Sequence, residues 1–225
     1  MARRLTRRGL LRGSAWACAG YWVVPRIMAD DSPSPNEKLN VACVGIDDFK
    51  AAYEMTNYLI GLGHRRIGFV KGHPSHTSGV QRAMGFEAAL HAAGSKVEKP
   101  VIAQGYYSYR SGLEAGEQLL SGRKLPTAIF ASNDDMASGV MAVAHRKGLD
   151  VPRDLSIVGF DDTIASAVWP GLTTVRQPIS DIAATAIDVI VRNMRSLRSG
   201  VKAKPRNYLV AHRLIERESA AAPPR

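Results

Sequence analysis

Short apolar stretches alternate with longer segments of helical periodicity along most of this 225-residue sequence. The stretches at 66–70 (RIGFV) and 155–160 (LSIVGF) each lie next to segments of about a dozen residues whose apolar side chains recur at helical spacing. A strand, a helix and a second strand in succession pack as a right-handed βαβ unit on a parallel sheet. The alternation therefore predicts an α/β fold, with a parallel sheet flanked by helices.

The predicted elements follow one another from residue 41 onward. We expect strands at 41–46, 66–70, 101–105, 128–131, 155–160 and 173–177, and helices at 50–62, 78–93, 108–121, 134–147 and 180–197. Segments 208–210 and 214–216 are expected to form a closing pair of strands. The side chains expected on related faces are Val80, Met84, Ala88 and His91 in the second helix, and those expected to face inward in the last helix are Ile182, Ala186, Val189 and Ile190.

The basic charge of the chain is concentrated at its N-terminus. The net charge is +10, but six arginines precede Asp30, the first acidic residue. The rest of the chain has 24 basic and 20 acidic residues, a net charge of +4. The basic excess therefore does not indicate a nucleic-acid surface on the folded body.

Residues 1–29 have the pattern of a targeting segment. An arginine-rich start is followed by an apolar stretch at 13–24, which is too short to span a bilayer but suits the core of a signal peptide. The run 6–12, TRRGLLR, resembles a twin-arginine export signal, with Ala29 at the cleavage point and a linker at 30–40. This suggests export to the periplasm without a membrane span. The alternative is a disordered basic arm with a chance apolar patch.

Polar side chains follow the predicted strands at the points where they end. Ligands of parallel α/β sheets collect at the carboxyl ends of the strands, and carboxylates, amides, arginine and aromatic rings together suit a polyhydroxylated ligand. For Asn133 and Asp161 we favour contact with a ligand. Asp134, Asp135 and Asp162 can each either contact a ligand or cap a helix. The residues that follow the strands are Asp47 and Asp48, then Lys71, His73 and His76, then Tyr106 and Tyr107, then 133–135, and finally 161–162.

Four segments carry a resemblance to the effector-binding domain of LacI/GalR-type transcriptional regulators. The resemblance extends over about residues 44–217 and implies a periplasmic-binding-protein type I fold, in which two α/β lobes close on a small molecule, usually a sugar or nucleoside. The family normally acts as a dimer. The segments are GLGHRRIGFVKG (61–72), QRAMGFEAALHAAG (81–94), PTAIFASNDDMASGVMAVAHRKGLDVPRDLSIVGFDDT (126–163) and PGLTTVRQPI (170–179).

The resemblance also implies which residues contact the ligand. By motif these are Asp47, Arg82, Tyr107, Asn133 and Asp161, with Ser78, Phe86 and Gln177 as weaker candidates. Tyr106 would fit the same place in the pattern as Tyr107. We expect no catalytic residue, metal site or cofactor.

Two departures from the family pattern change what is expected. Residues 1–40 contain no helix-turn-helix, so DNA binding would require one that this chain lacks, and most of the first lobe should precede VGIDD. We expect 41–63 to be a remnant of the first lobe and 64–225 to be mainly the second lobe, with crossover strands and the 180–197 helix. The second lobe is thus complete and the first mostly missing. Half a cleft should hold a sugar only at millimolar concentrations or not at all.

Residues 1–46 resemble a different family, the exported Gfo/Idh/MocA oxidoreductases. A NAD(P)-dependent oxidoreductase is nevertheless disfavoured, because Val44-Gly45 is followed by Ile46-Asp47-Asp48, without a second glycine to admit a pyrophosphate. The function expected is a small-molecule sensor domain that is not an enzyme. The alternative is an exported, periplasmic sugar-binding protein.

Overall fold

The computed structural model describes residues 43–199 and 206–224. The predicted signal segment at 1–29 and the linker at 30–40 lie outside the described residues. The main body is a parallel four-stranded sheet with strand order β3-β2-β4-β5. Its strands are β2 (Ile67–Lys71), β3 (Val101–Gln104), β4 (Ala128–Ala131) and β5 (Ser156–Val158).

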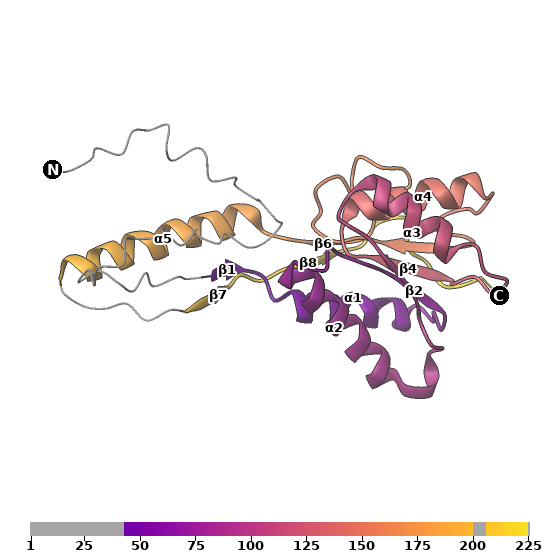
Figure 1. Cartoon of the computed structure of the whole chain (residues 1–225), viewed down its shortest axis with the longest axis horizontal. Coiled ribbons are helices and arrows are strands. Elements are labelled where there is room, and N and C mark those ends of the chain that lie inside the picture. Colours follow the sequence, from indigo (N-terminus) through magenta and orange to yellow (C-terminus); the bar gives the residue numbers. More distant parts are fainter. Residues whose placement is uncertain (1–42, 200–205, 225) are drawn as a thin grey trace.

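Helices cover both faces of this sheet, with one pair on each side (Figure 1). Phe69 and Phe130 are paired in register and lie with α1 and α2 in one core, whereas Val70 and Ile129 lie with α3 and α4 in a second core. Both faces are therefore apolar, as expected for a sheet buried on two sides. This confirms the predicted α/β fold. The helices are α1 (Asp48–Gly61), α2 (Thr77–Ala93), α3 (Tyr109–Leu119) and α4 (Asp134–Arg146), and a short 3₁₀ turn (Gly94–Lys96) follows α2.

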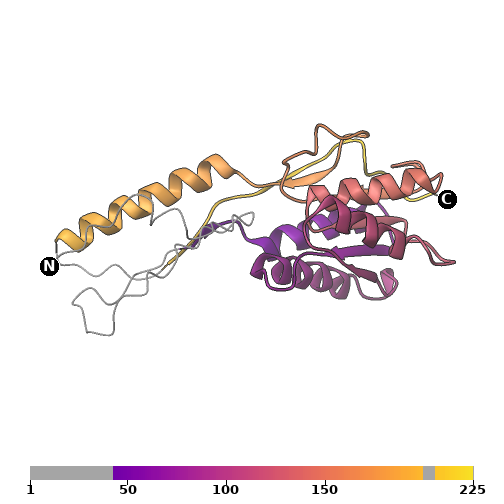
Figure 2. The ribbon, with the colours of Figure 1, turned by 45° about the horizontal axis from the view of Figure 1, so that its top comes forward.

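A second region, which we call the arm, extends away from the body in both views (Figures 1 and 2). It consists of α5 (Ile179–Arg198) and a parallel pair of strands, β1 (Cys43–Gly45) and β7 (Asn207–Leu209). A separate antiparallel pair, β6 (Thr174–Arg176) and β8 (Arg213–Ile215), joins the arm to the body. The predicted pairing of the last two strands with each other is therefore wrong, because β7 pairs in the arm and β8 pairs outside it.

Two predictions about buried helix faces also need correction. Val80 and Met84 of α2 are 47% and 49% exposed, and α2 approaches α1 through Gly85 instead. A side chain at Gly85 would clash with the backbone carbonyl of Phe49, so this close approach requires glycine. In α5, Ile182 and Val189 are buried as predicted, but Ile190 is 51% exposed.

Candidate functional site

The polar residues at the strand ends converge on one buried cation, Arg82 of α2. Its Nε donates to Oδ1 of Asp48 at 2.8 Å, and its Nη1 donates to the carbonyl of Ser132 and lies 3.4 Å from Oδ1 of Asp161. The guanidinium carbon is 3.6 Å from the ring centroid of Phe160, a cation–π distance. Because Arg82 is fully buried, these carboxylates and the ring are what make its charge tolerable in the interior.

Asp161 lies on the other side of this guanidinium. Nε2 of Gln177 donates to its Oδ1 at 2.5 Å, which brings the segment after β6 to the strand end of β5. Burial raises the pKa of Asp161 to about 7, although the charge of Arg82 opposes the rise. Its φ of 108° is a conformation that side-chain-bearing residues rarely adopt, and such strain is concentrated at functional sites.

The neighbouring polar residues of β4 and β5 have structural partners. Asn133 is the N-cap of α4 and accepts from the Met136 amide at 3.0 Å, so the capping role that we disfavoured for it is present. Asp134 accepts from Thr174 Oγ1 at 2.6 Å and from the Thr163 amide at 2.8 Å, and burial raises the pKa of its carboxyl. Asp162 pairs with two arginines, Arg176 and Arg217.

Tyr107 forms the aromatic side of the site. Its ring stacks on His76 at 5.5 Å between centroids, and the Arg82 guanidinium lies 5.9 Å from its centroid. Burial raises the pKa of the Tyr107 hydroxyl, and the charge of Arg82 offsets only part of this rise. Tyr106 is 52% exposed, so the structure brings Tyr107 and not Tyr106 to Arg82.

The structure separates the two aspartates that follow β1. Asp47 is the N-cap of α1 and accepts from the Lys50 amide at 2.9 Å, whereas Asp48 reaches Arg82. The sequence placed both aspartates among the polar residues at the strand ends, and the family resemblance implied ligand contact for Asp47 alone. The adjacent pair was visible in the sequence, but nothing local indicated which carboxylate meets an arginine of a later helix.

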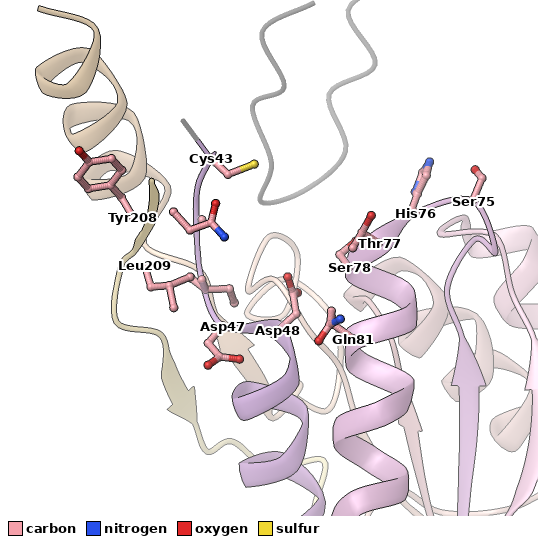
Figure 3. Close-up of a pocket in the computed structure, with 13 residues that line it drawn as sticks. Cys43, Asp47, Asp48, Ser75, His76, Thr77, Ser78, Gln81, Tyr208 and Leu209 are labelled. Carbon is pink, nitrogen blue, oxygen red and sulfur yellow. The ribbon is translucent and has the colours of Figure 1, made fainter. Parts of the chain in front are cut away.

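A cavity of about 730 Å³ opens beside this cluster (Figure 3). Residues of β1, β7 and the N-terminal ends of α1 and α2 surround it, including Asp47, Asp48, His76, Ser78 and Gln81. Its walls thus combine carboxylates, hydroxyls, an amide and an imidazole. Phe86 lies away from it in the core, where its ring stacks on Phe69 at 4.5 Å.

Three buried polar atoms of this cluster have no hydrogen-bond partner among the described residues: Asp48 Oδ2, Arg82 Nη2 and Gln177 Oε1. Buried polar groups are usually paired, so an unpaired set at the carboxyl edge of a sheet is typical of a site that a ligand completes.

The described residues give no support for a metal site or a membrane span. In 43–199 and 206–224, no three His, Cys, Asp or Glu side chains are placed to hold a metal ion. Within the same residues, no helix has the length and apolar character that crossing a membrane requires.

Residues 56–220 match the family described as periplasmic binding protein-like domain. Catabolite control protein A of Priestia megaterium is 39% identical over 173 residues, which are 76% of this chain and 51% of that protein. The chain thus spans about half the length of this curated relative.

Solved structures show the same fold. A complex of the transcriptional regulator CelR with cellobiose has a TM-score of 0.73 at 32% identity, over 80% of this chain and 54% of that one. A dimeric lac repressor with a C-terminal deletion has a TM-score of 0.71 at 29% identity, over 79% of this chain and 63% of that one. The chain belongs to the periplasmic binding protein-like domain family, and the proteins that it resembles in sequence and structure are LacI-type transcriptional regulators.

Proposed function

We propose that this chain is the effector-binding part of a LacI-type regulator and that its effector is a polyhydroxylated small molecule, a sugar or a nucleoside. The observation that carries this proposal is the buried Arg82, held between Asp48 and Asp161 beside an open cavity. A CelR structure with cellobiose bound supports the same ligand class.

The chemistry of the cluster suits hydroxyl groups. A hydroxyl donates one hydrogen bond and accepts others, so it can satisfy both a carboxylate oxygen and a guanidinium N–H. The stacked pair of Tyr107 and His76 offers an aromatic surface beside these polar groups. No nucleophile or general base is required by this function, and the proposal includes no catalytic step.

The partners proposed are a second copy of the chain and, through a helix-turn-helix supplied elsewhere in a regulator, DNA. The dimeric state of the related lac repressor supports the first. An exported sugar-binding protein is the second candidate, favoured by the twin-arginine-like run at 6–12. Both candidates use the same ligand site.

Nuclear magnetic resonance of the isotope-labelled chain tests the ligand class. We expect ribose, cellobiose or adenosine, titrated into the millimolar range, to shift the amide signals of Ser78, Arg82 and Asp161. Asp161→Asn should weaken this binding about tenfold or more, because it removes a charged hydrogen-bond acceptor. The matched control is Asp150→Asn, since the Asp150 side chain is 61% exposed and does not line the cavity. Shifts that avoid Ser78, Arg82 and Asp161, or equal binding by Asp161→Asn and the wild type, would contradict the proposal.

A further inference from the structure

The two aspartates at the end of β1 have different environments, although they are adjacent in sequence. Asp47 is partly exposed and its carboxylate accepts from the Lys50 amide at the start of α1. Asp48 is 2% exposed and its Oδ1 accepts from Arg82 Nε at 2.8 Å. Figure 3 shows the two side chains pointing in different directions from the same strand end.

The second oxygen of Asp48 is unsatisfied. Asp48 Oδ2 is buried and has no hydrogen-bond partner among the described residues, and Arg82 Nη2 is in the same condition. A buried polar atom without a hydrogen bond is costly, so the ion pair between Asp48 and Arg82 still leaves one atom of each side chain to be satisfied. Asp47 and Asp48 both line the 730 Å³ cavity, so the unpaired Oδ2 is what distinguishes Asp48 there.

We propose that Asp48, and not Asp47, is the carboxylate of this strand end that contacts the ligand. Its Oδ1 positions Arg82, and its Oδ2 accepts a hydrogen bond from a hydroxyl group of the ligand in the cavity. Asp47 caps α1 and makes no ligand contact. This inference rests on the proposed function, because it assigns a residue within the same ligand site.

The support for this assignment comes from two nearly fully buried side chains, Asp48 and Arg82, each with a polar atom that has no partner among the described residues. Of the two, Asp48 lines the cavity, and a ligand hydroxyl can donate to its free carboxylate oxygen.

The wild-type chain provides the first test. In a titration with ribose, cellobiose and adenosine, we expect the side-chain carboxyl carbon signal of Asp48 to shift with each compound that binds. The corresponding signal of Asp47 should stay in place. This measurement does not depend on whether any variant folds.

Two matched variants provide the second test. Asp48→Asn should weaken binding about tenfold or more, because it replaces a charged acceptor, whereas Asp47→Asn should weaken it much less, because the Asp47 carboxylate already accepts from the Lys50 amide. Without ligand, Asp48→Asn should also move the Arg82 Nε–H signal, and Asp47→Asn should not. A purely structural role for Asp48 would not shift its carboxyl signal when ligand is added to the wild-type chain.

The outcomes separate this inference from the proposed function. If the shifts avoid Ser78, Arg82 and Asp161, the proposed function fails and the inference fails with it. If the compounds bind but the Asp47 carboxyl responds and that of Asp48 does not, or if Asp48→Asn binds as the wild type does, the inference is overturned and the proposed function stands.

Discussion

The body and the arm of this molecule differ in how completely their apolar surfaces are covered. In the body, helices lie on both faces of the β2–β5 sheet, and Phe69, Phe130 and Ile129 are fully buried. In the arm, Ile187 of α5 is 62% exposed and Leu209 of β7 is 64% exposed. A parallel sheet is normally buried on both faces, whereas the described part of the arm, 43–45, 179–198 and 207–209, provides two strands and one helix.

This difference agrees with the length of chain that is matched in the relatives. The chain covers 63% of the dimeric lac repressor chain and 54% of the CelR chain. We propose that the body corresponds to a complete lobe and that the arm corresponds to part of a second one. Stability should depend on the body and only weakly on the exposed face of the arm.

The largest effect is expected from Phe130→Ala in the body. Phe130 is fully buried and its ring lies 5.3 Å from that of Phe69, so the substitution leaves a cavity between the sheet and α2. We expect a loss of about 3–5 kcal/mol in the free energy of unfolding, measured by urea denaturation. Tyr106→Ala is the control, since Tyr106 is 52% exposed. Equal losses of unfolding free energy for both variants would contradict the view that the buried core of the body carries its stability.

An intermediate effect, which depends on pH, is expected at His64, where the C-terminal segment meets the body. The ring is fully buried, with Nδ1 3.0 Å from Thr127 Oγ1 and Nε2 2.8 Å from the Ala221 carbonyl. Burial lowers its pKa below the ordinary 6.5. The unfolded chain therefore takes up a proton more readily than the folded one, so this stability is present above pH 6.5 and is lost as the pH falls below it.

The measurement compares urea midpoints of wild type and His64→Gln between pH 8 and pH 5. We expect the wild-type midpoint to fall more steeply than that of the variant on the acidic side of about 6.5, because glutamine does not titrate. Parallel curves for the two proteins would show that the buried imidazole does not govern this part of the pH dependence.

The smallest effect is expected in the arm. Ile187→Ser should change the free energy of unfolding by no more than about 0.5 kcal/mol, because the side chain is mostly exposed. The same variant should lower self-association measured by sedimentation velocity, since it removes apolar surface. Val189→Ser, on the buried side of α5, is the matched control and should destabilise the chain more. A large loss for Ile187→Ser would show that the outer face of α5 is covered in solution.

The predictions from sequence were most accurate where they depended on neighbouring residues. The strands and helices of the body lie close to their predicted bounds, and Arg82 and Asp161 do meet at one edge of the sheet. Predictions of which helix face is buried were less accurate. Val80 and Met84 suggested an apolar face for α2, but the close approach of Gly85 to α1 decided which side is buried.

By itself, the sequence determined the order of strands and helices and the polar residues that end each strand, because periodicity and capping are local properties. The tertiary structure alone decided that Asp48 faces Arg82, that Asp47 caps α1, and that β7 pairs with β1 and not with β8. The physical reason is distance along the chain. Asp48 and Arg82 are 34 residues apart, and their contact depends on how α1 and α2 pack, which no local pattern specifies.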